Sequence, residues 1–283
     1  MNRPQIAAVI PTLKGNVDKL VCALAEQTYS PDEVQVVKGV QPNGRARNQG
    51  VAATTADILL FIDDDALPGG PDLVERLVQI LLQDSTIAVV GPARVLPANA
   101  PWFQRRVAAE IPRIVNTVPR VPLETNPPLD RYGHSLITTT CCVMWRSVYE
   151  QVGGFSEEQE SGVDTEFFYR VRRLGRRFVM APDVYVSHPA PTSLRALLRK
   201  FHWYGTGSGQ EARRNPERRM GPRLTTPLHR AAFLVAATLW LVPNTFILYS
   251  YSYPHLELGF RPFKALSSYA VAWGYVRGWQ GSA

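Results

Sequence analysis

Apolar runs alternate with helical repeats along the first part of the chain. Gln5–Ile10 is an almost continuous apolar run that stops at Pro11, which is typical of a strand buried on both faces. The spacing of apolar residues predicts a helix over Asn16–Gln27. The same alternation continues with a strand over Glu33–Val37, a turn of sequence NGRARNQG that leads into a helix, a strand over Asp57–Ile62 and a helix over Pro71–Leu82. This order predicts a parallel, doubly wound α/β sheet.

The pattern becomes less regular after Gly91. Residues 97–128 are rich in proline, which predicts an irregular segment rather than a second core. Beyond it we expect strands over Ser135–Trp145, Arg177–Met180 and Val184–Val186, and helices over Arg146–Val152, Val163–Leu174 and Ser193–Tyr204. All of these elements fit a single α/β domain, which we place at residues 1–205.

The C-terminal part differs, because Ala231–Tyr251 contains no charged residue over 21 positions. About 20 apolar residues suffice to cross a bilayer, so the sequence predicts a hydrophobic, membrane-associated helical segment over residues 231–283. Pro243 and Asn244 interrupt the apolar run. The alternative is a buried or interfacial helical hairpin, whose second arm is Ala265–Trp279.

Basic residues are concentrated just before this apolar segment. The formal net charge is +7, and residues 195–230 hold nine basic residues against two acidic ones. We treat 206–230 as a basic linker, and the positive-inside rule places the N-terminal domain at the cytoplasmic face of the cell membrane. No nucleic-acid partner is expected, because the basic stretch lacks a recognised motif and interleaved stacking aromatics.

Composition adds two constraints on the class of protein. Hydrophobic residues make up 45% of the 283 positions, which is enough for a real core and excludes a disordered chain. The three cysteines, Cys22, Cys141 and Cys142, provide no disulfide framework, since adjacent cysteines rarely bridge each other. We therefore expect a reduced, cytosolic setting.

Three consecutive carboxylates, Asp63, Asp64 and Asp65, follow the third predicted strand. Alternation along an extended chain directs Asp63 and Asp65 to one side and Asp64 to the other. At a buried strand end, such a group is stabilised by a hard divalent cation, Mg²⁺ or Mn²⁺, which shares its coordination with substrate phosphates. The alternative is a solvated acidic turn. Arg45 and Arg47 are candidates for phosphate contacts, or form an exposed basic turn.

A second acidic cluster lies in GVDTEFFYRVRRLG, at residues 162–175. Asp164 and Glu166 fall at the start of a predicted helix, whose dipole stabilises anions. One of these carboxylates could deprotonate an attacking hydroxyl group; the alternative is helix capping, with Asp164 as the N-cap. His188 follows a short strand and is a candidate metal ligand through its neutral imidazole, or a structural histidine.

Several motifs together resemble the inverting family 2 glycosyltransferases of the GT-A fold. They occur in the family's order and spacing: AVIPT at 8–12, ARNQGVAATTADILLFIDDDALP at 46–68, VGGF at 152–155, GVDTEFFYRVRRLG at 162–175 and PDVYVSH at 182–188. The resemblance implies a GT-A (Rossmann-like) nucleotide-diphospho-sugar transferase domain, here with a C-terminal apolar helical tail. It also implies a divalent cation, Mg²⁺ or Mn²⁺, at the Asp-x-Asp position and single-displacement transfer with inversion.

The resemblance also implies roles for individual residues. Those on the donor side would be Pro11 and Thr12 at the nucleotide, Arg47 and Asn48 at the diphosphate and Asp63 at the ribose, together with Arg45 and Asp64. Asp65 would bind the metal, and His188 matches a position that in some relatives reaches the metal or the diphosphate. Alternation along the triplet adds Asp63 as a further candidate metal ligand. The catalytic base would be Asp164, with Glu166 as the second candidate. The acceptor side would be lined by Gly153, Gly154 and Phe155.

The chain departs from the family pattern at two places that matter for function. VVKGVQPNG, after the second strand, lacks the acidic pair that contacts the nucleotide in many relatives, which leaves the nucleotide open. The acidic neighbour usual before the base is replaced by Val163. In addition, LRKFHWYGTG at 198–207 does not reproduce the Gln/Arg-Trp motif of processive relatives, so we expect a non-processive enzyme.

The sequence therefore predicts a membrane-associated inverting glycosyltransferase. It would move a sugar from a nucleotide-diphospho-sugar to an acceptor hydroxyl, on a lipid-linked glycan or another cell-envelope acceptor. Two alternatives stay open. One is a catalytically inert glycan-binding or scaffold protein on the same fold. The other is a sugar-phosphate nucleotidyltransferase, which would require a Gly-rich phosphate loop where this chain has PTLKG.

Overall fold

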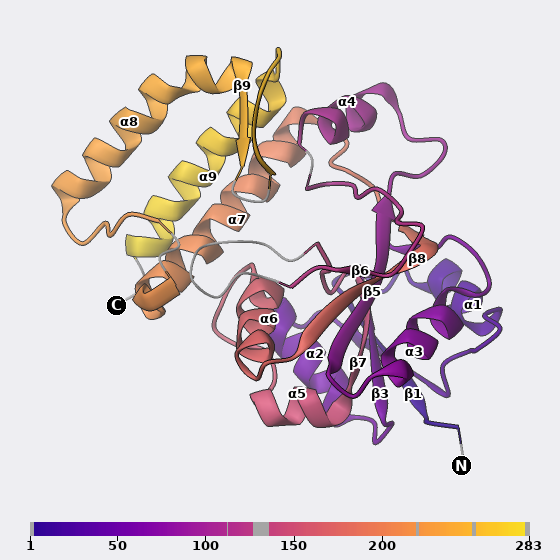
Figure 1. Cartoon of the computed structure of the whole chain (residues 1–283). Helices are drawn as coiled ribbons and strands as arrows, with labels where there is room; N and C mark the ends of the chain where they lie inside the picture. Colours follow the sequence, from indigo (N-terminus) through magenta and orange to yellow (C-terminus); the bar gives the residue numbers. More distant parts are fainter. Residues whose placement is uncertain (1–2, 112, 127–135, 219–220, 251–252, 281–283) are drawn as a thin grey trace.

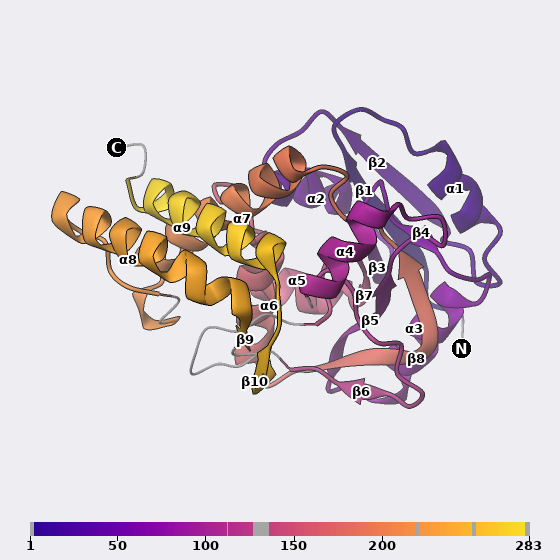
Figure 2. The ribbon, with the colours of Figure 1, turned by 90° about the horizontal axis from the view of Figure 1, so that it is seen from above.

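A computed structural model describes residues 3–111, 113–126, 136–218, 221–250 and 253–280. It contains one large sheet flanked by helices and, beside it, a group of long helices from the C-terminal part of the chain (Figures 1 and 2). The strands of the sheet follow the order β2-β1-β3-β7-β5-β8-β4, and β6 pairs with β8.

The N-terminal part of the sheet forms as the alternation of apolar runs predicts. Its elements are β1 (Ile6–Thr12), α1 (Asp18–Ala25), β2 (Glu33–Lys38), α2 (Asn43–Ala52), β3 (Ile58–Ile62), β4 (Leu67–Pro68), α3 (Leu73–Gln83) and β5 (Ile87–Val95). Every residue of β1 and β3 is buried, as expected of strands covered on both faces. One prediction is wrong here: the NGRARNQG segment is not a turn before a helix but forms most of α2 itself.

The two faces of the sheet pack against different helices. Ile58, Leu60 and Ile62 of β3 belong to a core cluster that includes side chains of α1 and α3. Leu59 and Phe61 point to the other face, into a cluster with side chains of α2, α5 and α6. Alternation along one strand therefore supplies both cores, because successive side chains point to opposite faces.

The sheet is mixed, which corrects the prediction of a purely parallel one. β1 pairs in parallel with β2 and β3, but β7 (Cys141–Trp145) lies antiparallel between β3 and β5. The chain leaves β3, passes through β4 and α3 and enters the central part of the sheet again two positions from β3 as β5. β7 fills the remaining position from the opposite direction. Sequence periodicity reports how a strand is buried but not the direction in which it runs.

The second half of the sheet contains the remaining strands and two short helices, β6 (Leu123–Glu124), α5 (Arg146–Val152), α6 (Val163–Arg173) and β8 (Arg177–Ser187). β8 is one long strand where the sequence predicts two. Its pairing with β5 is irregular around Gly91, and Asp183 adopts a positive φ of 58°. The predicted strand over Ser135–Trp145 is shorter than expected: β7 begins at Cys141, and Ser135 lies outside the described residues.

The proline-rich segment contains a helix that the sequence pattern did not indicate, α4 (Trp102–Glu110). It begins directly after Pro101, where a proline is compatible with a helix start. The carboxylate of Glu110 accepts hydrogen bonds from the backbone N–H groups of Phe263 (2.6 Å) and Lys264 (3.2 Å). α4 therefore stabilises the N-terminal end of a C-terminal helix, which explains why this acidic residue is buried.

The C-terminal elements are α7 (Leu194–Arg214), η1 (Pro216–Arg218), α8 (Pro227–Phe246), β9 (Ile247–Ser250), β10 (Tyr253–Leu258) and α9 (Pro262–Gln280). α7 and α9 approach each other through glycines: a Cβ atom at Gly274 would lie 1.9 Å from the His202 carbonyl oxygen, and one at Gly205 would lie 2.1 Å from that of Val271. The predicted helix over Ser193–Tyr204 is thus the first half of α7, and α7 continues past residue 205. The predicted domain boundaries remain a prediction.

The predicted apolar tail forms a helical hairpin. Along α8, Phe233 contacts the Tyr275 ring at 5.6 Å, and Thr238 lies 3.2 Å from the Tyr269 hydroxyl group, so α8 and α9 run antiparallel. This agrees with the alternative of two helical arms, the second over Ala265–Trp279. Among the described residues, no helix combines the length and the apolar character needed to cross a membrane. Tyr251, at the end of the predicted span, lies outside these residues.

Candidate active site at the carboxyl ends of the strands

A cavity of about 650 Å³ lies where β1 and β3 end. Pro11 and Thr12 of β1 line one wall, and Asp63, Asp64 and Asp65 follow β3 in its floor. The opposite wall comes from α7 and α9 and includes Trp203, Tyr204 and Val271. Open α/β sheets bind ligands at the carboxyl ends of their strands, and the prediction that the acidic triplet lies at such an edge agrees with this placement.

The acidic triplet divides as the alternation predicts. Asp64 accepts a hydrogen bond from the Thr12 hydroxyl group at 2.6 Å, which ties the end of β3 to the end of β1. Burial raises the pKa of Asp64, and the neighbouring Asp65 and Asp63 raise it further. Asp65 lies on the other side, with its carboxylate 3.3 Å from Nε2 of His188. The hydrogen bond from His188 and the charge of Lys200 outweigh partial burial, so that the pKa of Asp65 is lowered.

Asp63, Asp65 and His188 form a group that could hold a metal ion. One ligand atom from each residue lies within 4.8 Å of the others. Two carboxylates and one imidazole are a ligand set that suits Mn²⁺ and also accommodates Mg²⁺. The three residues leave further coordination positions for oxygen atoms of a substrate, since octahedral cations require six ligands. The donor chemistry of these side chains therefore fits the cation that the sequence predicts.

Asp164 lies on the same cavity as the metal-binding group. It is the second residue of α6, whose N-cap is Gly162, so the alternative in which Asp164 is the N-cap is wrong. Its carboxylate accepts a hydrogen bond from the backbone N–H of Thr165 at 2.9 Å. Burial raises the pKa of Asp164, and the charge of Arg47 opposes this rise. The two predicted acidic clusters, distant in sequence, thus share one cleft.

Two arginine side chains, one buried and one half-buried, lie on the same cavity as the acidic residues. Arg47 of α2 is 3% exposed and forms an ion pair with Asp63 at 2.8 Å. The guanidinium group of Arg94, on β5, donates two hydrogen bonds: one from Nε to Oδ1 of Asn116 at 3.2 Å and one from Nη2 to the carbonyl oxygen of Arg113 at 3.0 Å. Both guanidinium groups line the cavity. Guanidinium groups bind phosphate oxygens in planar, paired geometry, so this wall is suited to an anionic ligand.

Lys200 of α7 adds an ammonium group to the same cavity. The neighbouring Tyr204 and the carboxylates of Asp65 and Asp63 raise its pKa against the opposing effect of burial, which keeps it charged. Sequence reasoning missed both Lys200 and Arg94. Lys200 lies within the LRKFHWYGTG stretch that the family comparison singled out, whereas nothing in the pattern of β5 distinguishes Arg94.

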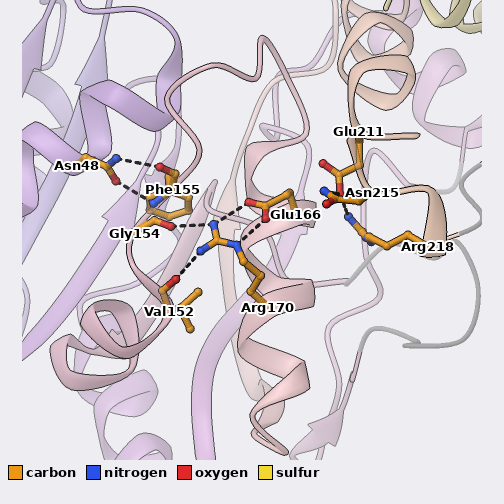
Figure 3. Close-up of polar contacts among 9 residues, drawn as sticks. All are labelled: Asn48, Val152, Gly154, Phe155, Glu166, Arg170, Glu211, Asn215 and Arg218. Atoms are coloured by element: carbon orange, nitrogen blue, oxygen red, sulfur yellow. Dashed lines mark hydrogen bonds and ion pairs between the residues drawn. The ribbon is translucent and has the colours of Figure 1, made fainter. Parts of the chain in front are cut away.

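Glu166, the second candidate base, does not line this cavity. Its carboxylate forms two contacts with Arg170, at 2.5 and 2.7 Å. Arg170 in turn donates to the carbonyl oxygens of Val152 (2.6 Å) and Gly154 (2.8 Å), as Figure 3 shows. Glu166 and Arg170 are one helical turn apart, so their side chains meet on one face of α6, away from Asp164. The structure therefore places Glu166 in a network that fixes the turn after α5.

Five other predicted site residues also lie away from the cavity wall. Both amide atoms of Asn48 are engaged by Phe155: Nδ2 donates to its carbonyl oxygen and Oδ1 accepts from its N–H, each at 2.9 Å (Figure 3). Arg45 is exposed and pairs with Glu157 at 3.4 Å. Gly153, Gly154 and Phe155 border a separate small hollow that also includes Glu166 and Arg170. These three residues therefore do not line the large cavity, and their acceptor role stays a prediction.

The mixed sheet, with an acidic cavity at its strand ends, defines an α/β fold of the GT-A-like class. A mannosyltransferase from Pyrobaculum calidifontis, PcManGT, solved in complex with GDP-Man and Mn²⁺, has a similar fold, with a TM-score of 0.59 over 99% of this chain and 89% of that one. The two sequences are 16% identical, so this likeness concerns the fold alone.

A family model described as glycosyltransferase like family 2 matches residues 6–206, so the chain belongs to that family. The prediction of a glycosyltransferase domain is confirmed at this level. The pre-mycofactocin glycosyltransferase of Mycobacterium tuberculosis is 28% identical over 61% of this chain, which spans 35% of that protein. The succinoglycan biosynthesis protein ExoM of Rhizobium meliloti is 24% identical over 69% of this chain and 66% of its own length.

Proposed function

We propose that the protein transfers a sugar from a nucleotide-diphospho-sugar to an acceptor hydroxyl group with inversion at the anomeric carbon. The observation that carries the proposal is the shared cavity. Asp63, Asp65 and His188 lie on one side of it and Asp164 on another, with space of about 650 Å³ around them. A cavity of this size is within the range of small-ligand sites.

The donor would bind across the ends of β1 and β3. Pro11 and Thr12, which line the cavity, would border the nucleotide, and Arg47, Arg94 and Lys200 on the same cavity would face the diphosphate. Asp63, Asp65 and His188 would hold the cation, which when bound would neutralise charge on the departing diphosphate. The complex of PcManGT with GDP-Man and Mn²⁺ supports a donor and a cation of these kinds.

Asp164 would act as the base in a single displacement. It takes the proton of the acceptor hydroxyl group as that oxygen forms a bond to the anomeric carbon of the sugar. The bond between the anomeric carbon and the diphosphate oxygen breaks in the same step, and the nucleoside diphosphate leaves. Arg47, Arg94 and Lys200 stabilise the negative charge that the leaving group gains. The raised pKa of Asp164 makes it a stronger base than an exposed carboxylate.

The acceptor would be a glycan or a lipid-linked glycan of the cell envelope. The names of the relatives support this class, because one is a succinoglycan biosynthesis protein and another an O-antigen biosynthesis protein, of Myxococcus xanthus. Trp203 and Tyr204 line the wall opposite the strand ends. Flat aromatic side chains of this kind offer an apolar face to a sugar ring while their polar edges remain free to form hydrogen bonds.

The test is a panel of nucleotide sugars offered to the full chain with Mn²⁺, with Mg²⁺ and with chelator, scored by release of the nucleoside diphosphate. We expect one donor to be turned over only with a cation, and Asp65→Ala to abolish its cation-dependent binding in calorimetry. Asp72→Asn serves as a control, because Asp72 pairs with Arg76 on α3, outside the cavity. An absence of both turnover and binding with every donor would instead indicate a catalytically inert protein.

A further inference from the structure

The outer face of α8 is an apolar surface that no other part of the described chain covers. Besides Trp240 (54%), which lies to one side, the most exposed large side chains of this helix are the five at Leu228 (76%), Leu239 (74%), Val242 (68%), Val235 (58%) and Phe246 (50%). At 100° per residue these five positions fall within one narrow stripe along the helix. With a rise of 1.5 Å per residue, the stripe is about 27 Å long.

The opposite face of α8 packs on α9 and needs no further partner. Phe233 and Leu234 join a cluster with Tyr275, Val276 and Trp279. At the other end of the helix, buried Asn244 accepts a hydrogen bond from the ammonium group of Lys264. Figures 1 and 2 show α8 as the outermost helix in both views, with α9 between it and α7. The stripe is therefore the outer side of an already packed helix, not an unfinished core.

The exposed charged side chains of α7, α8 and α9 are all basic, although an exposed acidic residue, Glu217 of η1, follows α7. α8 and α9 contain no acidic residue, and the only acidic residue of α7 is Glu211, which is buried and paired with Arg218. Exposed arginines cluster at the start of α8: Arg213 is the second-last residue of α7, Arg223 precedes α8, and Arg277 is near the end of α9. The Tyr275 hydroxyl group donates to the Pro222 carbonyl oxygen at 3.0 Å, which keeps the segment before α8 against α9.

We propose that the stripe of α8 and this arginine cluster together bind the surface of an anionic lipid bilayer, with α8 lying flat in the interface. An exposed apolar stripe of this length favours insertion between lipid headgroups. Basic side chains near its end are attracted by anionic headgroups. A second copy of the chain would match the apolar side chains but would bring like charges together, because the acidic residues needed to meet the arginines are absent from these helices.

This surface is separate from the catalytic residues but adjoins the site. α9 contributes Val271 to the wall of the cavity and packs against α8 on its other side. A bilayer bound at α8 would therefore lie next to the wall formed by α7 and α9. Membrane binding itself does not rest on the proposed activity, so that each can be tested without the other.

The test is co-sedimentation of the full chain with vesicles of phosphatidylcholine, with and without phosphatidylglycerol. We expect binding that increases with phosphatidylglycerol. The double variant Leu239→Glu, Val242→Glu should lower the partition coefficient by more than roughly tenfold, because it removes apolar contact and adds repulsion. The matched control is Leu82→Glu, at a 49% exposed position on α3 across the sheet from α8, and it should bind as the wild type does.

A second pair of variants separates the charge contribution. Arg223→Gln and Arg277→Gln should each weaken binding to phosphatidylglycerol vesicles roughly fivefold, with little effect on neutral vesicles. The proposal is overturned if the wild type binds neither vesicle or if the α8 double variant binds normally. It is also overturned if light scattering shows a dimer that this variant dissociates. In lipid-free solution, the wild type and the α8 double variant should release nucleoside diphosphate at equal rates. If neither protein releases it, the proposed function is contradicted and the membrane proposal is unaffected.

Discussion

Glu166→Gln tests whether the two acidic residues of α6 have separate roles. In the folded protein the Glu166 carboxylate makes two short contacts with Arg170, which holds the Val152 and Gly154 carbonyl oxygens. An amide retains one acceptor but loses the charge. Hydrogen bonds to charged groups contribute about 1.5–3 kcal/mol each. Since the Arg170 side chain is 30% exposed, we expect a loss near the lower end of that range, about 2 kcal/mol.

Asp164→Asn is the matched substitution two residues earlier. The Asp164 carboxylate has one hydrogen bond, from Thr165 N–H, which an asparagine preserves. The substitution also removes a carboxylate whose ionisation burial disfavours, so the free energy of unfolding should not fall. Turnover should fall by roughly 10²–10⁴-fold, the usual contribution of general base catalysis.

The two variants are compared by thermal unfolding and by release of nucleoside diphosphate from the best donor. For a domain of this size a loss of 2 kcal/mol lowers the Tm by about 4–8 °C, which is expected for Glu166→Gln alone. Below its Tm this variant should retain most of the wild-type turnover. The reasoning is refuted if Glu166→Gln unfolds normally and is inactive while Asp164→Asn remains active.

Three further predictions concern the metal, the helix interface and the pH dependence. Asp65→Asn should weaken Mn²⁺ binding by roughly tenfold or more in calorimetry; unchanged affinity would remove it from the metal site. Gly274→Ala should destabilise the protein by about 1–3 kcal/mol in denaturant unfolding, because its Cβ would meet the His202 carbonyl oxygen, whereas Ser268→Ala on the exposed side of α9 should not. Because burial raises the pKa of Asp164 and the base acts only when ionised, turnover should begin to fall with decreasing pH above the usual carboxyl pKa of about 4; an activity profile that stays flat down to that pH would contradict the assignment.

The sheet strands and the acidic residues of the site could be predicted because their signals are local. A strand buried on both faces leaves a continuous apolar run, as in β1 and β3, and the carboxylates directly after β3 lie where such strands end. The grouping of Asp63 and Asp65 apart from Asp64 follows from alternation alone, and the structure agrees. These features depend on a few consecutive residues, so the sequence is sufficient for them.

Features that depend on distant contacts could not be predicted. The direction of β7 depends on which sheet position β5 leaves free. Glu166 matched the acidic pattern of a site, but the partner that determines its role, Arg170, is one helical turn away and faces other elements. Arg94 and Lys200 both line the cavity because the end of β5 and the first half of α7 lie beside the same strand edge. Residue type therefore identified the candidate residues, whereas contacts with residues distant in the sequence determine which candidates line the cavity.

The charges of the cavity indicate why the cation and the donor are expected to bind together. The cavity is lined by nearly equal numbers of basic and acidic side chains, namely Lys14, Arg47, Arg94, Arg113, Lys200 and Arg218 against Asp63, Asp64, Asp65, Asp164 and Glu211. A divalent cation alone would add positive charge beside buried guanidinium groups, and a diphosphate alone would add negative charge beside the aspartates. Both are costly where water is partly excluded. A doubly charged diphosphate that shares the cation's coordination leaves the balance unchanged, so each ligand removes the electrostatic penalty of the other.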